Sequence, residues 1–248
     1  MPKFFVDQKQ IDNDSIIVRG EDAHHIARSL RMAVGECITV SDMNYNEYKC
    51  ILDKITDAEV KAVITEKYKS DVESPVKIHL YQALPKGEKL DFIIQKSVEC
   101  GVYDVTPFES ERCVVKVKND AESRKTERRN KIALEAAKQC GRGIVPIVKP
   151  TVSFEQMLEG ASASDLVLFC YEGNDTERIG SVLKAERANN EIKDISIIIG
   201  SEGGFSEKEA EIAKSCGHKM IGLGKRILRA ETAAIFALTC IVYEFELS

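Results

Sequence analysis

The chain has 248 residues, of which 44% are hydrophobic and 30% are charged, and its formal net charge is -5 at pH 7. A chain of this length holds one large domain or two smaller ones, and its composition is that of an ordinary soluble globular protein. Taken alone, the acidic balance argues against a strongly basic nucleic-acid binder.

The cysteines and histidines show no pattern of a metal site. None of the eight cysteines forms a C-x-x-C pair, and the four histidines make no metal box. A disulfide framework is not expected at this size. Met1–Phe4 lacks a long apolar run after a basic one, and no stretch reaches about 18 apolar residues, so we expect neither a signal peptide nor a membrane span. We predict a cytoplasmic protein with reduced thiols, no metal and no membrane partner.

The first 70 residues have the pattern of a small antiparallel barrel. Three runs of alternating or β-branched apolar residues predict strands at 36–42, 47–55 and 60–68. Apolar residues at helical spacing predict one helix at 22–32. The polar segment 69–75 ends in proline and is typical of a linker, so the first predicted domain spans residues 1–70.

After Pro75, strands alternate with helices. We predict strands at 76–84, 102–108, 165–171, 195–199 and 218–223, and helices at 88–100, 126–140, 207–216 and 232–245. The runs at 165–171 and 195–199 are continuously apolar, as in buried parallel strands. The pattern indicates an α/β domain with a mostly parallel sheet over residues 76–248.

Positive charge gathers between Arg112 and Lys149. This stretch holds 11 Lys or Arg against 4 Asp or Glu, a local balance of +7. A basic stretch in an acidic chain is a candidate anion-facing surface. A solvated helix face explains it about equally well.

Two glycine-bearing segments follow strand ends. In Ile197–Ser206 a buried strand leads through a glycine-rich turn into a helix opened by a capping box at Ser206 and Glu209. Open α/β sheets bind ligands at the carboxyl ends of their strands. Glu202 inside this turn disfavours a polyphosphate and suits a ligand with a positive centre or sugar hydroxyls. A purely structural turn is the alternative.

The second segment is Leu223–Ala233, which again lies between a strand and a buried helix. It crowds Lys225, Arg226 and Arg229 into one loop beside an apolar core. An anionic substrate explains three cations there better than a solvated loop does.

The two segments, GSEGGFSEKE and LGKRILRAETA, together resemble the signature motifs of the SPOUT-class methyltransferases. More narrowly, the chain is similar to the bacterial ribosomal small subunit methyltransferase E family, which methylates N3 of a uridine in 16S ribosomal RNA. Further patches that carry the resemblance include Ser110-Glu111-Arg112 and the run from Glu135 to Arg142.

The resemblance implies an N-terminal PUA-like β-barrel that helps bind RNA and a C-terminal SPOUT-type α/β domain with a trefoil knot. It implies a homodimer that binds S-adenosyl-L-methionine and acts on 16S rRNA of the small ribosomal subunit. The positions that match the cofactor loops are Gly200, Glu202, Gly203, Gly204, Leu223, Gly224, Ile227, Leu228, Glu231, Thr232 and Ala233.

Arg229 is our predicted catalytic residue, because a cation near the uracil oxygens would stabilise the charge that develops once N3 loses its proton. Glu202 is the second candidate, as a base or as a cofactor-orienting group. The candidate RNA-binding residues are His25, Arg28, Arg31, Arg112, Arg128, Arg129 and Arg142.

Two departures from the family pattern stand out. Ser201 replaces the usual Pro, and Cys100 replaces the usual Leu. The alternatives that the sequence leaves open are a methyltransferase of the same class acting on another RNA base, a non-catalytic RNA-binding assembly factor, and an enzyme using a nucleotide phosphate. The last lacks a P-loop lysine and a G-x-G-x-x-G spacing.

Overall fold

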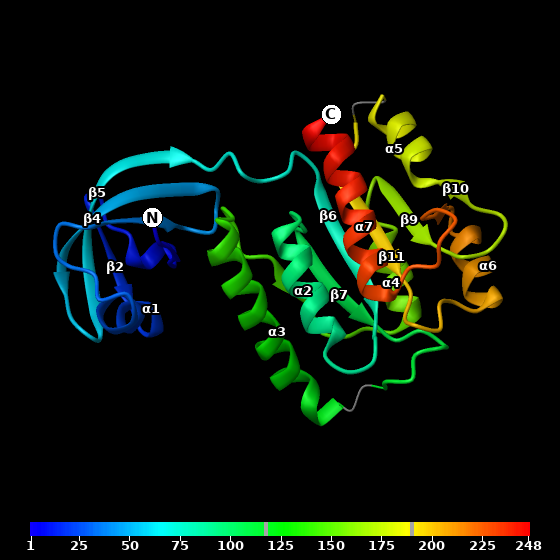
Figure 1. The fold of residues 1–248 in the computed structure, drawn as a ribbon, viewed down its shortest axis with the longest axis horizontal. Helices are drawn as coiled ribbons and strands as arrows, with labels where there is room; N and C mark the ends of the chain where they lie inside the picture. Colours follow the sequence, from blue (N-terminus) through cyan, green and yellow to red (C-terminus); the bar gives the residue numbers. More distant parts are fainter. Residues whose placement is uncertain (117–118, 189–190) are drawn as a thin grey trace. The chain divides into compact units, whose positions relative to one another are not determined.

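The computed structural model describes residues 1–116, 119–188 and 191–248. It divides into two compact units (Figure 1). Unit 1 comprises Met1–Glu73 and Ala137–Val145, and unit 2 comprises Ser74–Ala136 and Pro146–Ser248. Among the described residues, none of the helices has the length and apolar character needed to cross a membrane.

Unit 1 is a curled five-stranded sheet in the order β1-β3-β4-β5-β2. The strands are β1 (Lys3–Phe5), β2 (Ser15–Arg19), β3 (Cys37–Ser41), β4 (Asn46–Ile55) and β5 (Glu59–Lys69), with a short turn η1 (Gln8–Gln10), a helix α1 (Glu21–His24) and its continuation η2 (His25–Ser29). The β1–β3 pair is parallel and the others are antiparallel. Alternating side chains of the strands, with Ile26 from η2, close a core that is almost fully buried.

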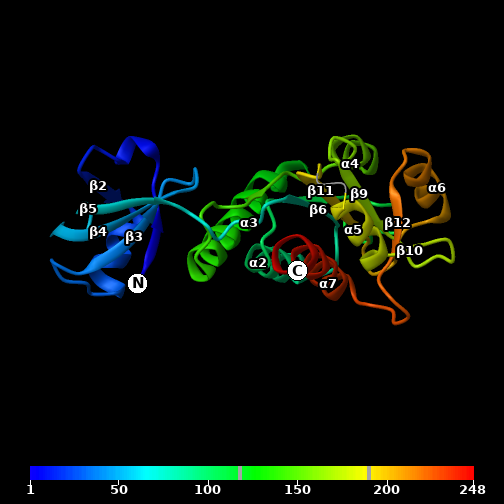
Figure 2. The same ribbon diagram turned by 90° about the horizontal axis from the view of Figure 1, so that it is seen from above.

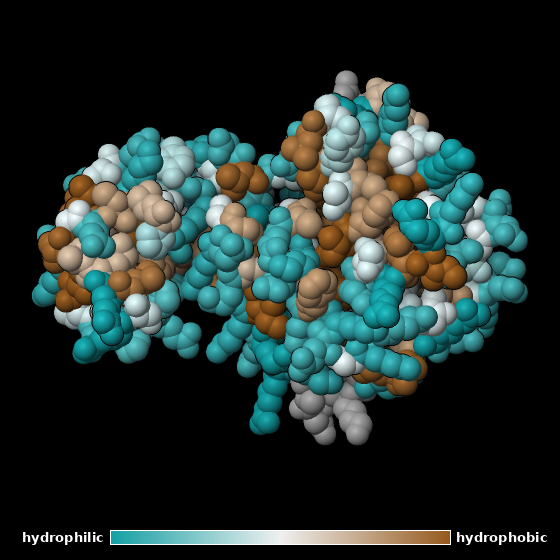
Figure 3. Space-filling model, viewed as in Figure 1, coloured by the Kyte–Doolittle hydropathy of each residue, from teal (hydrophilic) through white to brown (hydrophobic). Residues whose placement is uncertain are grey.

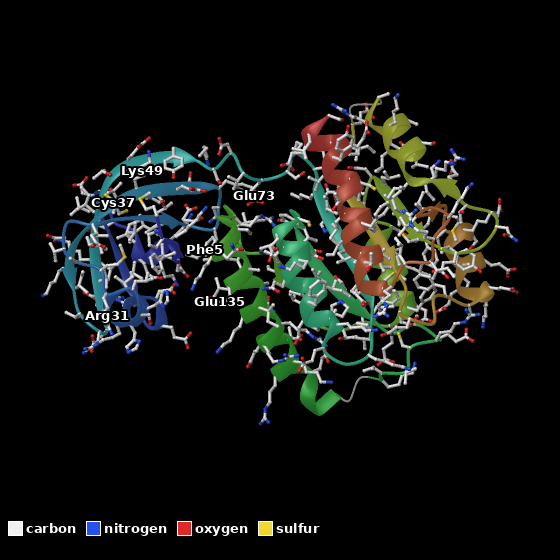
Figure 4. The ribbon with its side chains drawn as sticks, viewed as in Figure 1. Phe5, Arg31, Cys37, Lys49, Glu73 and Glu135 are labelled. Atoms are coloured by element: carbon white, nitrogen blue, oxygen red, sulfur yellow. The ribbon has the colours of Figure 1, made fainter. Side chains whose placement is uncertain are left out.

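The segment Ala137–Val145 belongs to unit 1 although it lies far along the chain. The carboxylate of Glu73 accepts hydrogen bonds from the guanidinium of Arg142 and from the backbone N–H of Gly143 at 2.7 Å (Figure 4). Lys138 donates to Asp22 at 2.7 Å. These contacts attach the end of a helix to the barrel, which the sequence pattern did not indicate.

Unit 2 contains a seven-stranded, all-parallel sheet in the order β10-β12-β9-β11-β6-β7-β8. Its strands are β6 (Lys77–Ala83), β7 (Asp104–Phe108), β8 (Ile147–Val148), β9 (Leu166–Cys170), β10 (Glu177–Arg178), β11 (Asp194–Ile199) and β12 (Lys219–Gly222). Its helices are α2 (Lys89–Glu99), α3 (Asn119–Cys140, whose end enters unit 1), α4 (Phe154–Ala161), α5 (Ile179–Arg187), α6 (Glu207–Ser215), α7 (Ala230–Val242) and the closing η3 (Tyr243–Leu247).

The sheet is covered on both faces, which explains its continuously apolar strands. Figure 2 shows α2 and α7 on one face and α4 and α6 on the other. Ile195 and Ile197 to Ile199 of β11 are all buried, as are Leu166 to Phe169 of β9. Two helices begin at complete capping boxes, α4 at Ser153 with Gln156 and α6 at Ser206 with Glu209.

The predicted fold class, a PUA-like barrel and a SPOUT-type α/β domain, is confirmed, and each predicted strand and helix is present. The helix predicted at 126–140 is longer than expected and already begins at Asn119. In unit 1, the pattern missed β1 and β2, and with them the parallel pair. In unit 2, it missed the two-residue strands β8 and β10 and the helices α4 and α5. The shortest strands leave no measurable period, but Ser153-x-x-Gln156 was a readable helix start.

Candidate active site

The candidate site lies at the carboxyl edge of the parallel sheet in unit 2. Because the strands run in the same direction, the segments that follow β6, β7, β11 and β12 all leave the sheet at this edge. The two segments singled out in the sequence are the glycine loop, residues 200–206 between β11 and α6, and the basic loop, residues 223–229 between β12 and α7.

The glycine loop is a tight turn that requires its glycines. The N–H of Gly204 donates to the carbonyl of Ser201 at 2.9 Å, and Gly204 has a φ of 62°. A Cβ on Gly200 would lie 3.2 Å from both the Cα of Gly204 and the ring of Phe205. Phe205 is buried and its ring centroid lies 4.3 Å from that of Phe169, so the loop is anchored in the core.

The segment after β7 holds the glycine loop from a second side. Arg112 donates to the carbonyl of Gly203 at 3.1 Å, and a Cβ on Gly203 would lie 3.0 Å from the Cβ of Arg112. Glu111 accepts a hydrogen bond from the Ser206 hydroxyl at 2.7 Å, and its N–H donates to Glu209 at 2.8 Å. The Ser110-Glu111-Arg112 patch therefore braces this loop and the start of α6.

Glu202 is held by the segment that follows β6. Its carboxylate accepts from the N–H of Lys86 at 3.1 Å and from the ammonium of Lys89 at 2.7 Å. Burial raises the pKa of Glu202, but these hydrogen bonds and the charge of Lys89 outweigh it, so the pKa lies below the ordinary value. A carboxylate with a lowered pKa is a weak base, which favours the orienting role over proton abstraction.

The basic loop presents its cations to solvent. Lys225, Arg226 and Arg229 are exposed, and their side chains have no hydrogen-bond or ion-pair partner among the described residues. Arg229 is the N-cap of α7 without a side-chain capping bond. Ile227 is 86% exposed, so its side chain does not line the interior of this chain, although its backbone lies in the predicted cofactor loop.

The other cofactor candidates surround the start of α7 and the end of β12. Gly224 has a φ of 112°, which only glycine adopts readily. Glu231 is in the first turn of α7, and its Oε2 is buried without a hydrogen-bond partner in the described structure. The remaining positions are Leu223, Leu228 and Ala233, which are half-buried, and Thr232, which is exposed.

Most of the basic stretch is neutralised within the protein. Arg129 is 6% exposed and bonds to Glu122, and Arg142 is 5% exposed and bonds to Glu73. These two arginines are buried anchors, so the structure corrects their assignment as RNA contacts. Lys149 pairs with Asp104; Lys118 lies outside the described residues.

The remaining RNA candidates are accessible. In unit 1, Arg31 (labelled in Figure 4) and His25 are exposed, and Arg28 is exposed in an ion pair with Asp57. In unit 2, Arg128 is exposed and pairs with Asp91. An exposed ion pair contributes little stability, so Arg28 and Arg128 can exchange their partners for phosphate at small cost.

Sequence reasoning missed Lys89 and the bracing role of Glu111. A lysine as the first residue of a helix was a readable signal, because a cation there opposes the helix dipole. Within the described part of the chain, no group of three or more His, Cys, Asp or Glu side chains is placed to hold a metal.

The pattern of the RNA methyltransferase domain family matches residues 72–242, and that of the RNA methyltransferase PUA domain matches residues 18–65. The chain is 35% identical to the ribosomal RNA small subunit methyltransferase E of Bacillus subtilis over 100% of this chain and 98% of that protein. The chain belongs to this methyltransferase E family. The family predicted from the sequence is thereby confirmed.

Two solved structures similar to this chain contain S-adenosyl methionine. A ribosomal RNA small subunit methyltransferase E from Neisseria gonorrhoeae bound to S-adenosyl methionine superposes with a TM-score of 0.85 and 29% identity, covering 98% of this chain and 97% of that one. A methyltransferase from Legionella pneumophila with bound cofactor SAM has a TM-score of 0.83 and 30% identity, covering 97% and 96%.

Proposed function

We propose that this protein transfers a methyl group from S-adenosyl-L-methionine to N3 of a uridine in 16S rRNA of the small ribosomal subunit. The observation that carries the proposal is a glycine loop and a basic loop at one sheet edge, in a chain whose relatives are named for this rRNA and include structures with the cofactor bound. The cations of the basic loop are exposed and lack partners among the described residues, which favours a polyanionic substrate.

The residues of this edge suit the cofactor. Gly200, Gly203 and Gly204 leave the backbone free of side chains, and Glu202 and Glu231 supply negative charge. The cofactor, when bound, supplies a methyl group on positively charged sulfur, which is a strong electrophile. The protein's task is then mainly to position the two reactants.

Arg229 stabilises the uracil in its reactive form. N3 becomes nucleophilic when its proton passes to solvent water, and the negative charge spreads over O2 and O4 of the ring. An exposed guanidinium without an internal partner is free to donate to these oxygens. Because N3 is a pairing edge, the uridine is bound unpaired or flipped out.

The proposal includes a homodimer that works in the cytoplasm. Helices α2 and α7 pack together and expose the apolar side chains of Phe92 at 49% and Phe236 at 40%, and Tyr243 at the start of η3 is 61% exposed. Figure 3 shows apolar surface among polar residues on the face that carries these helices. Light scattering of the wild type and of Phe236→Glu tests this: a monomeric wild type contradicts the dimer.

The deciding experiment is methyl transfer to 30S subunits from a bacterial strain that lacks the gene. We expect labelled methyl from the cofactor to enter one uridine as 3-methyluridine, identified by mass spectrometry. Naked 16S rRNA, assayed in parallel, decides between free RNA and the assembled subunit as substrate. Methylation of another base would contradict uridine N3 as the target and identify a different one. Absence of both cofactor binding and transfer would favour the non-catalytic assembly factor.

A further inference from the structure

We propose that Lys89 is a positioning residue that joins the two cofactor loops by holding Glu202 and Glu231 around one ammonium. The inference rests on the proposed function and deepens it. It assigns to this junction the recognition of the positively charged part of S-adenosylmethionine.

The geometry places Lys89 between the loops. Its Nζ lies 2.7 Å from Oε1 of Glu202 in the glycine loop and 4.0 Å from Oε2 of Glu231 in the first turn of α7. The side chain is 35% exposed, against 29% for Glu202 and 19% for Glu231. One lysine at the start of α2 therefore contacts both the glycine loop and the first turn of α7, which directly follows the basic loop; α6 and β12 separate the two contacts in the chain.

The position of Lys89 on its own helix is unfavourable. It is the first residue of α2, where the partial positive charge of the helix dipole repels a cation. The N-cap, Glu88, makes no side-chain capping bond that would relieve this. The interaction with the two carboxylates accounts for a lysine at this site.

The junction is incomplete in the protein alone. Oε2 of Glu231 is buried and accepts no hydrogen bond, because Lys89 at 4.0 Å is too far away to donate. An unsatisfied buried carboxylate oxygen is costly, so a donor or a cation from a ligand would relieve it. This oxygen is the structural observation that points to a ligand.

The charges are complementary to the cofactor. Two carboxylates and one ammonium leave the junction with a net charge of -1. S-adenosylmethionine has a sulfonium, an ammonium and a carboxylate, and so a net charge of +1. Without Lys89, the carboxylates would repel each other and the loops would lose their common anchor.

The test compares Lys89→Met with Lys96→Met. Lys96 lies on the same helix, has a similar exposure of 37%, and pairs locally with Glu99. By calorimetry we expect Lys89→Met to weaken binding of S-adenosylmethionine about tenfold, Lys89→Arg to restore it to within about threefold, and Lys96→Met to leave it unchanged. Binding by Lys89→Met within twofold of the wild type, or an equal loss in Lys96→Met, overturns the proposal.

Two further readouts separate positioning from general stability. Lys89 lowers the pKa of Glu202, so in Lys89→Met the loss of cofactor binding on acidification should begin at a higher pH than in the wild type. Without ligand, amide exchange in residues 200–204 and 228–233 should be faster in Lys89→Met and unchanged in Lys96→Met. If the pH at which cofactor binding is lost is the same in Lys89→Met and the wild type, or if amide exchange is unchanged, the positioning role is contradicted.

The outcomes also distinguish the two proposals. A wild type that fails to bind S-adenosylmethionine sinks the proposed function and the recognition role together, whereas amide exchange still decides whether Lys89 joins the loops. A wild type that binds and methylates, beside a Lys89→Met that does the same, sinks only the role of Lys89. If Lys89→Met does not fold, Lys89→Gln replaces it with the same expectations.

Discussion

The two ends of the parallel sheet in unit 2 differ in how their charges are satisfied. At the amino end, His79 of β6 bonds to Asp104 of β7 at 3.0 Å and to Asp194 of β11 at 3.1 Å, and Lys149 bonds to Asp104 at 2.9 Å. At the carboxyl end, the cations of the basic loop have no partner among the described residues, and Glu231 has a buried oxygen without a hydrogen bond.

This difference separates stability from function along one set of strands. The amino-end network joins three adjacent strands and the segment after β8, because both ring nitrogens of His79 and the ammonium of Lys149 bond to carboxylates of the protein itself. Oδ1 of Asp104 is buried without a hydrogen-bond partner in the described structure, but His79 and Lys149 are both paired. The carboxyl end keeps the cations of the basic loop and one oxygen of Glu231 without partners among the described residues, which lowers stability but leaves these groups available to a ligand. Mutations at the amino end should therefore change mainly the free energy of unfolding, and mutations at the carboxyl end should change mainly methyl transfer.

The largest effect is expected at the amino end, from Asp104→Ala. Asp104 is 5% exposed, and its removal leaves His79 and Lys149 without their shared partner. Removing one member of a buried pair costs about 3–5 kcal/mol, which urea unfolding measures. The matched control is Asp175→Ala, whose exposed pair with Lys214 should contribute little to stability. Equal losses in both variants would contradict a stabilising network at the amino end.

At the carboxyl end, Arg229→Ala should lower kcat about 100-fold, equivalent to about 2.7 kcal/mol of transition-state stabilisation, with little change in melting temperature. The reason is that the side chain of Arg229 is exposed and bonds to no described residue, while its backbone bond to Ala233 survives the substitution. Arg178→Ala is the control, because Arg178 is likewise an exposed helix N-cap without a side-chain capping bond. Near-normal methyl transfer by Arg229→Ala in a folded protein would remove its assigned role.

The carboxyl end was the more predictable of the two from the sequence. The apolar run Ile197–Ile199, the glycines and the Ser206–Glu209 capping box locate the glycine loop from local pattern alone. The partners of charged residues do not follow from such patterns. Glu202 meets Lys89 from 113 positions away, and Arg142 meets Glu73 from 69, so the burial of Arg142 could not be read from its basic neighbourhood.

The amino-end network should also show in the pH dependence of stability. Burial lowers the pKa of His79, but hydrogen bonds and charges from Asp104 and Asp194 outweigh it and the net pKa is raised. The stabilisation is then complete below the unfolded pKa of about 6.5 and is lost as pH rises through the higher folded value. The Asp104 pKa is lowered, so this carboxylate stays ionised across that range.

The other groups at His79 do not reverse this sign. Tyr103 packs edge-on against the imidazole, and the ammonium of Lys77 lies over the ring of Tyr103. Lys149 bonds to the same oxygen of Asp104 as His79 does. We expect the difference in unfolding free energy between wild type and His79→Gln to fall by about 1 kcal/mol between pH 6 and pH 9. His218 is a control with the opposite pH dependence. Burial lowers its pKa, so its contribution to stability is lost as pH falls and not as pH rises. A constant difference across this range would argue against a charged His79.

The smallest expected effect is Ser201→Pro, which restores the residue usual in the family at the carboxyl end. Ser201 is 8% exposed, and its hydroxyl is buried without a partner among the described residues. Its carbonyl accepts from Gly204, and proline retains that carbonyl.

Proline should raise the free energy of unfolding by about 0.5 kcal/mol, because it restricts the unfolded chain and removes an unsatisfied hydroxyl. Ser201→Ala removes the hydroxyl alone and separates the two causes in the same urea experiment. A loss of stability with proline but not with alanine would mean that the backbone at Ser201 does not tolerate the proline ring. The glycine loop of this chain would then have a turn conformation that differs from the one a proline at this position allows.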